Sequence, residues 1–277
     1  MEVLSKVNYR LNSERLNLNR LIRYFNQVNR RYFSLERPTY RVTNWVYNHL
    51  QLEPGEIILD LSCHHGDIWL ENDVSLCPFI KVFLADQYLV NIRLTQQRLL
   101  KQSFEYDIRL MDYNHLQYES NVFDKAITKL GFNVLEINEH YSMIRECHRV
   151  LNSIGKGYFL INENKIQSGF NQILNDFDSN LKELEFIQVD KKSIMNYVSS
   201  FFKDVEVQTY ENELRFTSAK QLIDFYISNK HDAFVEHIVK KHRIQEFNIY
   251  LQNKISQLGS ISIEISFTMF IGEGKIC

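Results

Sequence analysis

The chain has 277 residues, of which 44% are hydrophobic and 24% are charged, and its formal net charge is -2. These values are typical of a globular protein with one sizeable core. A nearly neutral chain gives no sign of a polyanion-binding surface, and no apolar run reaches the roughly 18 residues that a membrane span needs. We therefore expect neither a nucleic-acid partner nor a membrane partner.

The cysteines and the N-terminal residues bear on the cellular compartment. The four cysteines are scattered and form no Cys-x-x-Cys pair, which indicates reduced thiols instead of a disulfide framework. The first 20 residues carry polar side chains where a signal peptide would need its apolar segment. The sequence therefore predicts a cytoplasmic protein.

The first 50 residues have the pattern of helices. Apolar residues recur at helical spacing over residues 13–32, and a second helix is predicted after Pro38, with Val42, Trp45 and Leu50 on its apolar face. The residues "EPGE" then break this pattern. We therefore predict a helical N-terminal cap over residues 1–50.

From residue 57 onward, strand and helix patterns alternate along the chain. This alternation predicts a parallel sheet with helices on both faces. The predicted strands are residues 57–61, 81–86, 107–112, 123–131 and 156–163, and the predicted helices are residues 88–102 and 140–151.

The last third of the chain differs, because helical patterns dominate it. Residues 166–202 are mostly helical, and further helices are predicted from residue 217 to about residue 258. Strands are predicted at 204–210 and, from its alternating pattern, at 260–272. The predicted second domain is therefore residues 51–277, with a helical insertion around residues 165–202.

The stretch "LDLSCHHGD", residues 59–67, follows the first predicted strand. Ligands of open parallel sheets bind at the carboxyl ends of the strands, and the first strand-to-helix turn is the usual anchor because its backbone amides let a cofactor approach. Asp86 ends the next predicted strand, where an acid can accept hydrogen bonds from both hydroxyls of a ribose. These features favour a nucleotide-like cofactor.

Four segments in order resemble the class I S-adenosylmethionine-dependent methyltransferases, in particular their small-molecule branch. "PGEIILDLSCHHGD" is similar to the family's first motif, PGxxVLDLGCGxGD, and "LMDYNHLQYESNVFDKAI" resembles its third-strand motif. "IRECHRVLNSIGKGYFLI" is similar to E-x-x-R-V-L-x-P-G-G, and the tail resembles the family's late helix and last strand. The resemblance implies an α/β, Rossmann-like, doubly wound sheet of seven strands with an antiparallel last strand.

The resemblance also implies where S-adenosylmethionine would bind. Asp60 would orient the first turn, whose backbone would hold the methionine part of the cofactor. Asp86 would bind the ribose with Gln87 beside the adenine, and Asp112 would accept from the adenine amine. The other implied cofactor residues are Ser62, Cys63, His64 and Gly66 in the turn, Tyr113 near the ring, and Thr128 and Lys129 near the sulfonium.

The first turn departs from the family pattern, since Ser62 and His64 replace two of its three glycines. His64 could swing aside and leave cofactor binding unchanged. Alternatively, His64 or His65 handles the substrate, because a histidine with a pKa near 6.5 can act as a general base. In a third interpretation the pocket no longer binds the cofactor productively. A metal site of Cys63, His64 and His65 is the least favoured, because adjacent residues on a tight turn rarely aim at one ion, and we predict no metal.

Further candidates lie outside this turn. His64, His115 and Tyr40 are the candidate catalytic residues, and Tyr32 and Arg41 are candidates to fold over the cofactor. For Tyr32, Tyr40 and Arg41, a surface or packing role explains each residue at least as well, and a lone histidine such as His115 is more often an ordinary loop residue. The family's Pro-Gly-Gly turn is replaced by residues 153–155, which are still expected to form a turn.

The resemblance predicts a methyltransferase of the EC 2.1.1 type. It would transfer a methyl group from S-adenosylmethionine to an O, N, S or C nucleophile of a small molecule, as a monomer or homodimer. One alternative is an enzyme that uses the cofactor without methylating, such as a cyclase or a lyase. Another is a degenerate binding subunit, which the retention of Asp60, Asp86 and Asp112 disfavours.

Overall fold

The computed structural model describes residues 41–129, 131–179, 189–228, 234 and 238–276. The helix predicted over residues 13–32 and the candidates Tyr32 and Tyr40 therefore lie outside the described residues. Residues 39–213 with 263–277 belong to one compact unit, and residues 214–262 belong to another. The candidate site lies entirely in the first of these units, the sheet unit.

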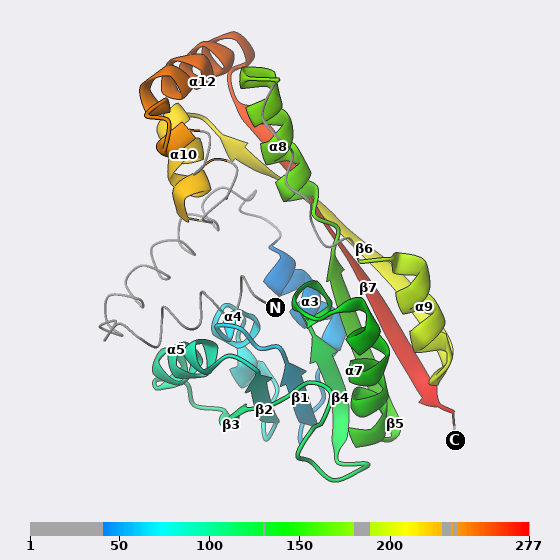
Figure 1. The fold of residues 1–277 in the computed structure, drawn as a ribbon. Coiled ribbons are helices and arrows are strands. Elements are labelled where there is room, and N and C mark those ends of the chain that lie inside the picture. Colours follow the sequence, from blue (N-terminus) through cyan, green and yellow to red (C-terminus); the bar gives the residue numbers. More distant parts are fainter. Residues whose placement is uncertain (1–40, 130, 180–188, 229–233, 235–237, 277) are drawn as a thin grey trace. The chain divides into compact units, whose positions relative to one another are not determined.

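A seven-stranded sheet with strand order β3-β2-β1-β4-β5-β7-β6 forms the framework (Figure 1). Strands β1 to β5 pair in parallel, and β7 pairs antiparallel to β5. This confirms the predicted Rossmann-like, doubly wound α/β fold with its antiparallel last strand. The strands are β1 (Ile57–Leu61), β2 (Lys81–Asp86), β3 (Glu105–Leu110), β4 (Phe123–Thr128), β5 (Leu151–Asn162), β6 (Phe202–Phe216) and β7 (Ile261–Lys275).

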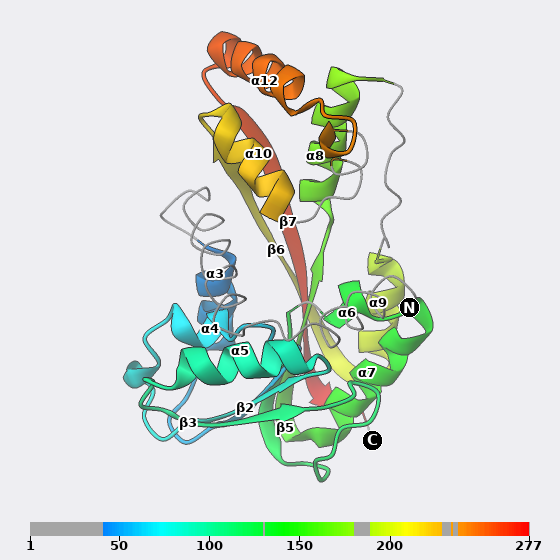
Figure 2. The same ribbon diagram turned by 60° about the vertical axis from the view of Figure 1, so that its left-hand side comes forward.

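Helices cover both faces of this sheet (Figures 1 and 2). The Tyr158 hydroxyl of β5 donates to the Leu50 carbonyl of α3 at 3.4 Å, whereas Phe159 belongs to the cluster that packs against α7. Since successive strand residues point to opposite faces, α3 and α7 lie on opposite sides. The helices of this unit are α3 (Val42–Leu50), α4 (Asp67–Leu70), α5 (Leu89–Leu99), α6 (Gly131–Val134), α7 (Ile137–Val150), α8 (Lys165–Phe177) and α9 (Lys191–Ser199).

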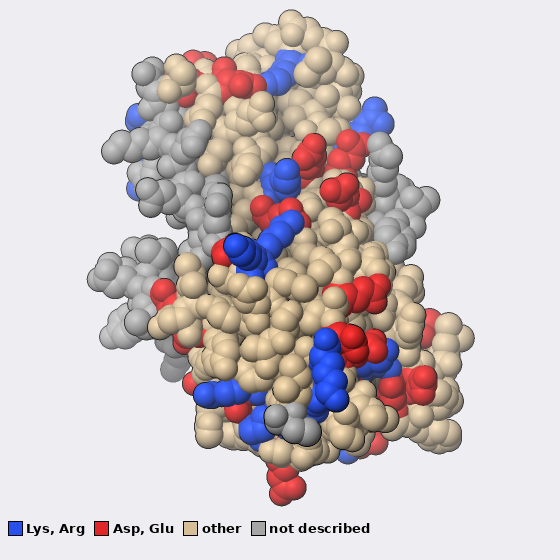
Figure 3. Space-filling view, turned by 90° about the vertical axis from the view of Figure 1, so that its right-hand side faces the viewer, with Lys and Arg blue, Asp and Glu red and all other residues tan. Residues whose placement is uncertain are grey.

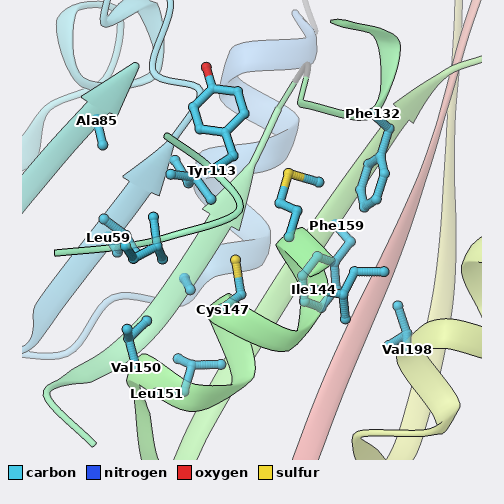
Figure 4. Close-up of a cluster of buried hydrophobic side chains, with 14 of the residues drawn as sticks. Leu59, Ala85, Tyr113, Phe132, Ile144, Cys147, Val150, Leu151, Phe159 and Val198 are labelled. Carbon is cyan, nitrogen blue, oxygen red and sulfur yellow. The ribbon is translucent and has the colours of Figure 1, made fainter. Parts of the chain in front are cut away.

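The helix α7 shows why these residues form a helix and what it buries. Its apolar residues recur at helical spacing, and Glu136 and Glu139 form a capping box at its start. Ile144, Cys147 and Val150 are fully buried against the sheet (Figure 4). Each such side chain contributes about 1.5–3 kcal/mol on burial, so this face anchors the strands whose ends carry the site.

The second unit has a small aromatic core of its own. Its described helices are α10 (Ala219–Ser228) and α12 (Ile244–Leu258). The Tyr226 and Phe234 rings stack at 4.8 Å, and both pack against Phe247 at 5.8 Å. All three side chains are fully buried. Within the described part of the chain, no helix combines the length and the apolarity that crossing a membrane requires.

Most predicted elements are present, but several boundaries were wrong. β3 begins at Glu105, two residues before the prediction, and β4 ends at Thr128, three residues before it. The turn predicted over residues 153–155 is wrong, since these residues lie within β5. There the register with β4 shifts between Phe123 and Lys125, so a bulge accommodates the residues that the motif predicted as a turn.

Candidate functional site

The turn between β1 and α4 keeps the backbone of a glycine-rich loop. Ser62, His64 and Gly66 have φ angles of 70°, 53° and 72°, in the left-handed region that glycine adopts without steric cost. These are the three positions where the family motif has glycine. The two substitutions have therefore kept the shape of the turn, at a cost of about 1–2 kcal/mol for each side chain held in this region.

The turn is attached to the end of β2. The backbone N–H groups of Ser62 and Cys63 both donate to the Ala85 carbonyl, over 2.9 and 3.0 Å. Burial, together with the nearby Asp60 and Asp86, raises the pKa of the Cys63 thiol well above its ordinary value. Cys63 is therefore a protonated, buried thiol and a poor nucleophile.

The helix α5 holds the other side of the turn. The Thr95 hydroxyl donates to the His64 carbonyl at 2.8 Å, and Arg98 Nη1 donates to the His65 carbonyl at 2.7 Å. A Cβ on Gly66 would lie 3.1 Å from Thr95 Cγ2, so α5 also leaves no room for a larger residue there. With both sides bonded, the turn is rigidly placed over the carboxyl end of β1.

Two polar atoms at this end of the sheet are buried without a partner among the described residues. Asp60 Oδ2 accepts from Trp69 Nε1 at 2.7 Å, but Asp60 Oδ1 and Thr128 Oγ1 have no hydrogen bond. Thr128 is aligned with Leu61, next to Asp60, in the pairing of β1 with β4. Buried polar atoms normally have partners, so both atoms are free to bind a ligand.

The environment of Asp60 also changes its protonation. Burial raises the pKa of its carboxyl group to about 7, although the Trp69 hydrogen bond and the charge of Lys129 act in the opposite direction. At neutral pH the carboxyl group therefore exists in both protonation states. It can accept or donate a hydrogen bond to a ligand.

The two adjacent histidines stack on each other beside this carboxyl group. Their ring centroids are 3.7 Å apart with an interplanar angle of 37°. Burial and the charge of Lys129 lower the pKa of His64 to about 4, and burial and the neighbouring ring lower the pKa of His65 further. Both imidazoles are neutral at pH 7, and His64 is a weaker base than its sequence alone predicts.

Charged side chains surround the histidine pair. Burial by itself would raise the pKa of Asp67, but the charges of Lys129 and Arg98 lower it below its ordinary value. Arg98 Nη1 lies 2.5 Å from Asp67 Oδ1. The charge of Lys129 acts on His64, Asp67 and Asp60, which shows that its side chain lies close to the turn.

Asp86, the predicted ribose ligand, is already hydrogen-bonded within the protein. Its Oδ2 accepts from the His64 N–H at 3.0 Å, and its Oδ1 accepts from the Tyr88 N–H at 2.9 Å and from Asn91 Nδ2 at 3.1 Å. The side chain is 2% exposed, and this burial raises its pKa. Asp86 therefore supports the loops around the turn, and its contact with a ribose stays a prediction.

The residues after β3 take different positions. Asp112 is exposed and its Oδ1 accepts from the Asn114 N–H at 2.8 Å, and His115 is exposed as well. Tyr113 is fully buried in the core cluster (Figure 4). Its hydroxyl lies 3.4 Å from the Gln87 N–H. His115 is therefore exposed, whereas His64 is half-buried and His65 is buried.

Sequence reasoning missed three residues that shape the turn. Asp67, Thr95 and Arg98 were not predicted, although all three contact residues 64–66 or their side chains. Asp67 had a signal, since it is the last acid of the first motif. The two α5 residues had none, because they follow 28 or more residues later on an ordinary amphipathic helix.

Basic and acidic side chains are interspersed on the face of the molecule drawn in Figure 3. Ion pairs of the sheet unit include Lys156 with Glu273 and Lys165 with Glu264. This face has no broad basic area of the kind that a polyanion would need.

Known proteins share this fold. A methyltransferase domain family matches residues 59–159, and no curated protein matches the chain. A Bacillus halodurans C-125 protein assigned as a methyltransferase is 13% identical, with a TM-score of 0.53 over 85% of this chain and 99% of that chain. The cyclase SpnF is 14% identical, with a TM-score of 0.50 over 86% of this chain and 81% of that chain. The mycolic acid cyclopropane synthase CmaA1, solved with SAH, is also 14% identical, with a TM-score of 0.50 over 83% of this chain and 82% of that chain.

The domain match covers β1 to β5, which carry the first turn and every described residue of the candidate cofactor site. The strand order around that turn places it at the switch point between β1 and β4, where ligands bind in sheets of this kind. Residues 59–159 therefore match a methyltransferase domain family, and the sheet that contains them has the fold of the class I S-adenosylmethionine-dependent methyltransferases.

Proposed function

We propose that the chain is an S-adenosylmethionine-dependent methyltransferase that acts on an O, N, S or C nucleophile of a small molecule. The observation that carries this proposal is the pair of buried, unpartnered atoms Asp60 Oδ1 and Thr128 Oγ1 at the switch point. They lie beside a turn that has the backbone of the family's glycine loop. A polar ligand that enters between β1 and β4 would satisfy both.

The residues present fit this cofactor. The backbone around Ser62 and Gly66 would hold its methionine part, with the buried Asp60 at the end of β1 just before the turn. Thr128 and Lys129 would border its reactive end, and the exposed Asp112 has an oxygen free to receive the adenine amine. Of the solved structures with this fold, CmaA1 was determined with SAH, which supports the same choice of cofactor.

The protein's contribution to the reaction is positioning and exclusion of water. When bound, S-adenosylmethionine supplies an electrophilic methyl group. Asp60 and Thr128 are 1% and 0% exposed. A ligand group bound beside them would therefore be oriented by fixed protein dipoles and not by mobile solvent molecules. His64 carries no proton at neutral pH, so it is the half-buried candidate to accept one from a substrate, and His115 is the exposed candidate.

A second candidate function keeps the cofactor but not the methyl transfer. His64 fills a glycine position, and Lys129 brings a positive charge to the turn. A cation near the sulfonium would disfavour S-adenosylmethionine relative to its neutral-sulfur product. The cyclase SpnF has this fold as well, so a cyclase or lyase reaction is the alternative.

Analysis of the spent cofactor distinguishes the two candidates. The full chain is incubated with S-adenosylmethionine and a small-molecule extract, and the nucleoside products are identified by mass spectrometry. Methyl transfer predicts S-adenosylhomocysteine, whereas cyclisation or cleavage of the cofactor predicts methylthioadenosine. An unchanged cofactor with every extract would contradict both methyl transfer and cleavage of the cofactor, and would leave a substrate cyclisation that does not consume the cofactor, or a binding subunit.

Other expectations remain proposals. We propose a helical cap over residues 1–50 and a methyltransferase domain over residues 51–277, with the insertion around residues 165–202. We also propose a cytoplasmic monomer or homodimer with no nucleic-acid or membrane partner.

A further inference from the structure

We propose that His64, His65 and Asp67 form a binding site for a divalent transition metal such as zinc. Each of the three side chains offers one ligand atom, and these atoms all lie within 4.8 Å of one another. This inference departs from the expectation of no metal, and it goes beyond the proposed methyl transfer. Asp67, which sequence reasoning did not consider, replaces Cys63 as the third ligand.

The backbone of the turn explains how neighbouring residues can aim at one ion. In an extended strand, successive side chains would point to opposite sides. The left-handed conformation of His64, with φ at 53°, turns the chain so that its ring stacks on that of His65. The same residue that departs from the glycine motif therefore creates the pair of nitrogen donors.

The distances are compatible with a single ion. Zinc binds histidine nitrogen and carboxylate oxygen at about 2.0–2.2 Å, so the ligand atoms of one site lie roughly 3.4 Å apart in a tetrahedron. Small side-chain rotations would close the observed spread of up to 4.8 Å. Three protein ligands leave one position of a tetrahedral ion open for water or a substrate.

An outer layer of hydrogen bonds holds the ligands in place. Arg98 Nη1 donates both to Asp67 Oδ1 and to the His65 carbonyl. The Thr95 hydroxyl donates to the His64 carbonyl. Protein metal sites depend on such outer-shell bonds to orient their ligands. Here α5 supplies a bond to each of the three residues.

The donor types determine the class of metal. Two imidazoles and one carboxylate suit zinc, nickel or cobalt, whereas magnesium and calcium prefer sites made only of oxygen. The positive charge of Lys129 lies near the same residues and opposes a cation. Replacing Lys129 with methionine should therefore tighten metal binding, which a site elsewhere on the chain would not show.

The test is a calorimetric titration of the chelator-treated full chain with zinc, without any cofactor. We expect one ion per chain in the wild type. His64→Gly and Asp67→Asn should lose affinity by more than the roughly 10- to 100-fold that loss of an outer-shell partner costs. His64→Gly removes a ligand but suits the left-handed backbone, so circular dichroism should show it folded. The matched control, His242→Ala, removes an exposed histidine of the other unit and should bind zinc as the wild type does.

Cobalt provides a second readout. Cobalt bound to the wild type should give the intense visible absorption of a four-coordinate site, and His64→Gly should abolish it. Equal zinc affinity and stoichiometry in the wild type and His64→Gly would overturn the proposal, as would a wild type that does not bind zinc. Because no cofactor is present, these failures leave the proposed methyl transfer untouched. Conversely, failure to methylate would not affect the zinc result.

Discussion

The two halves of the candidate site differ in whether their polar side chains are already hydrogen-bonded within the protein. At the ends of β1 and β4, Asp60 Oδ1 and Thr128 Oγ1 are buried without a partner among the described residues. At the end of β2, both oxygens of Asp86 accept hydrogen bonds from the protein. Asp112, after β3, is exposed to solvent.

This difference shows that an acid at a strand end can serve three separate purposes. Asp60 has one buried oxygen without a hydrogen-bond partner among the described residues, Asp86 ties the first turn to the loop after β2, and Asp112 is exposed to solvent. A sequence motif marks the position of all three acids equally. Only their hydrogen bonds and burial separate a ligand-binding acid from a structural one.

The largest expected change in the free energy of unfolding comes from substituting Asp86. Asp86→Ala removes the acceptor of three donors, His64 N–H, Tyr88 N–H and Asn91 Nδ2. Each donor left without a partner costs about 1–3 kcal/mol, so the free energy of unfolding should fall by about 5 kcal/mol. Urea unfolding followed by circular dichroism measures this. Asp86→Asn, which keeps one acceptor oxygen, is the control and should lose less. A loss for Asp86→Ala below about 1 kcal/mol would show that these bonds do not support the turn.

The next effect is a pH dependence that comes from Asp60. Burial raises its folded-state pKa from 3.8 to about 7, so the folded state keeps a proton that the unfolded state releases. Its stabilising contribution is present below pH 4 and is lost as the pH rises through 7. Relative to the wild type, Asp60→Asn should therefore gain up to about 4 kcal/mol between pH 4 and pH 8.

Unfolding curves of both proteins across this range provide the measurement. The difference between them isolates Asp60 from the histidines, whose lowered pKa values act in the opposite direction. A constant difference across the range would mean that Asp60 titrates normally and is not buried as described.

A smaller effect is expected at the altered glycine position. His64→Gly should stabilise the fold by about 1 kcal/mol at pH 7, because glycine adopts the left-handed backbone without strain. The gain should grow as the pH falls from 6.5 toward 4, since His64 in the folded protein, with a pKa of about 4, resists the proton that the unfolded chain takes up.

The matched control for this prediction is Gly66→Ala, which should destabilise the fold. Its φ is 72°, and the added Cβ would lie 3.1 Å from Thr95 Cγ2. Thermal unfolding of His64→Gly and Gly66→Ala, each compared with the wild type, measures both changes in stability. If the two substitutions changed stability in the same direction, the turn would not have the backbone of a glycine loop.

The smallest stability effect belongs to the exposed acid. Asp112→Ala should change the free energy of unfolding by no more than about 0.5 kcal/mol, as is usual for surface residues. Its cofactor affinity should nevertheless fall by about 10-fold, the cost of one hydrogen bond to a charged acceptor. A variant that retained full affinity would exclude Asp112 from the adenine site.

Much of the fold could be predicted from local patterns. β1 and β2 lie where their apolar runs predict them, and α3 buries Val42, Trp45 and Leu50 as expected. β5 begins five residues before the predicted strand, at Leu151, which pairs with Phe123 of β4. Strand ends are set by neighbours in the sheet, which a single segment does not reveal.

The candidate site could be predicted in its position but not in its contacts. The motif identified Asp60, Ser62 and His64 correctly as neighbours on the first turn. It did not reveal that α5 reaches this turn through Arg98, or that His64 stacks on His65. The Arg98 contact depends on tertiary packing between residues 33 positions apart, and the stacking depends on the left-handed backbone of His64.

The central claim is that the first turn, with its two histidines, still admits a sulfonium nucleoside at the switch point. A calorimetric titration of the full chain with S-adenosylhomocysteine, repeated with S-adenosylmethionine, tests it most directly. We expect binding of both ligands by the wild type and weaker binding by Asp60→Asn, whose fold stays intact. A folded wild type that gives no binding heat at roughly millimolar ligand, where a Kd of about 1 mM would be visible, would contradict the claim.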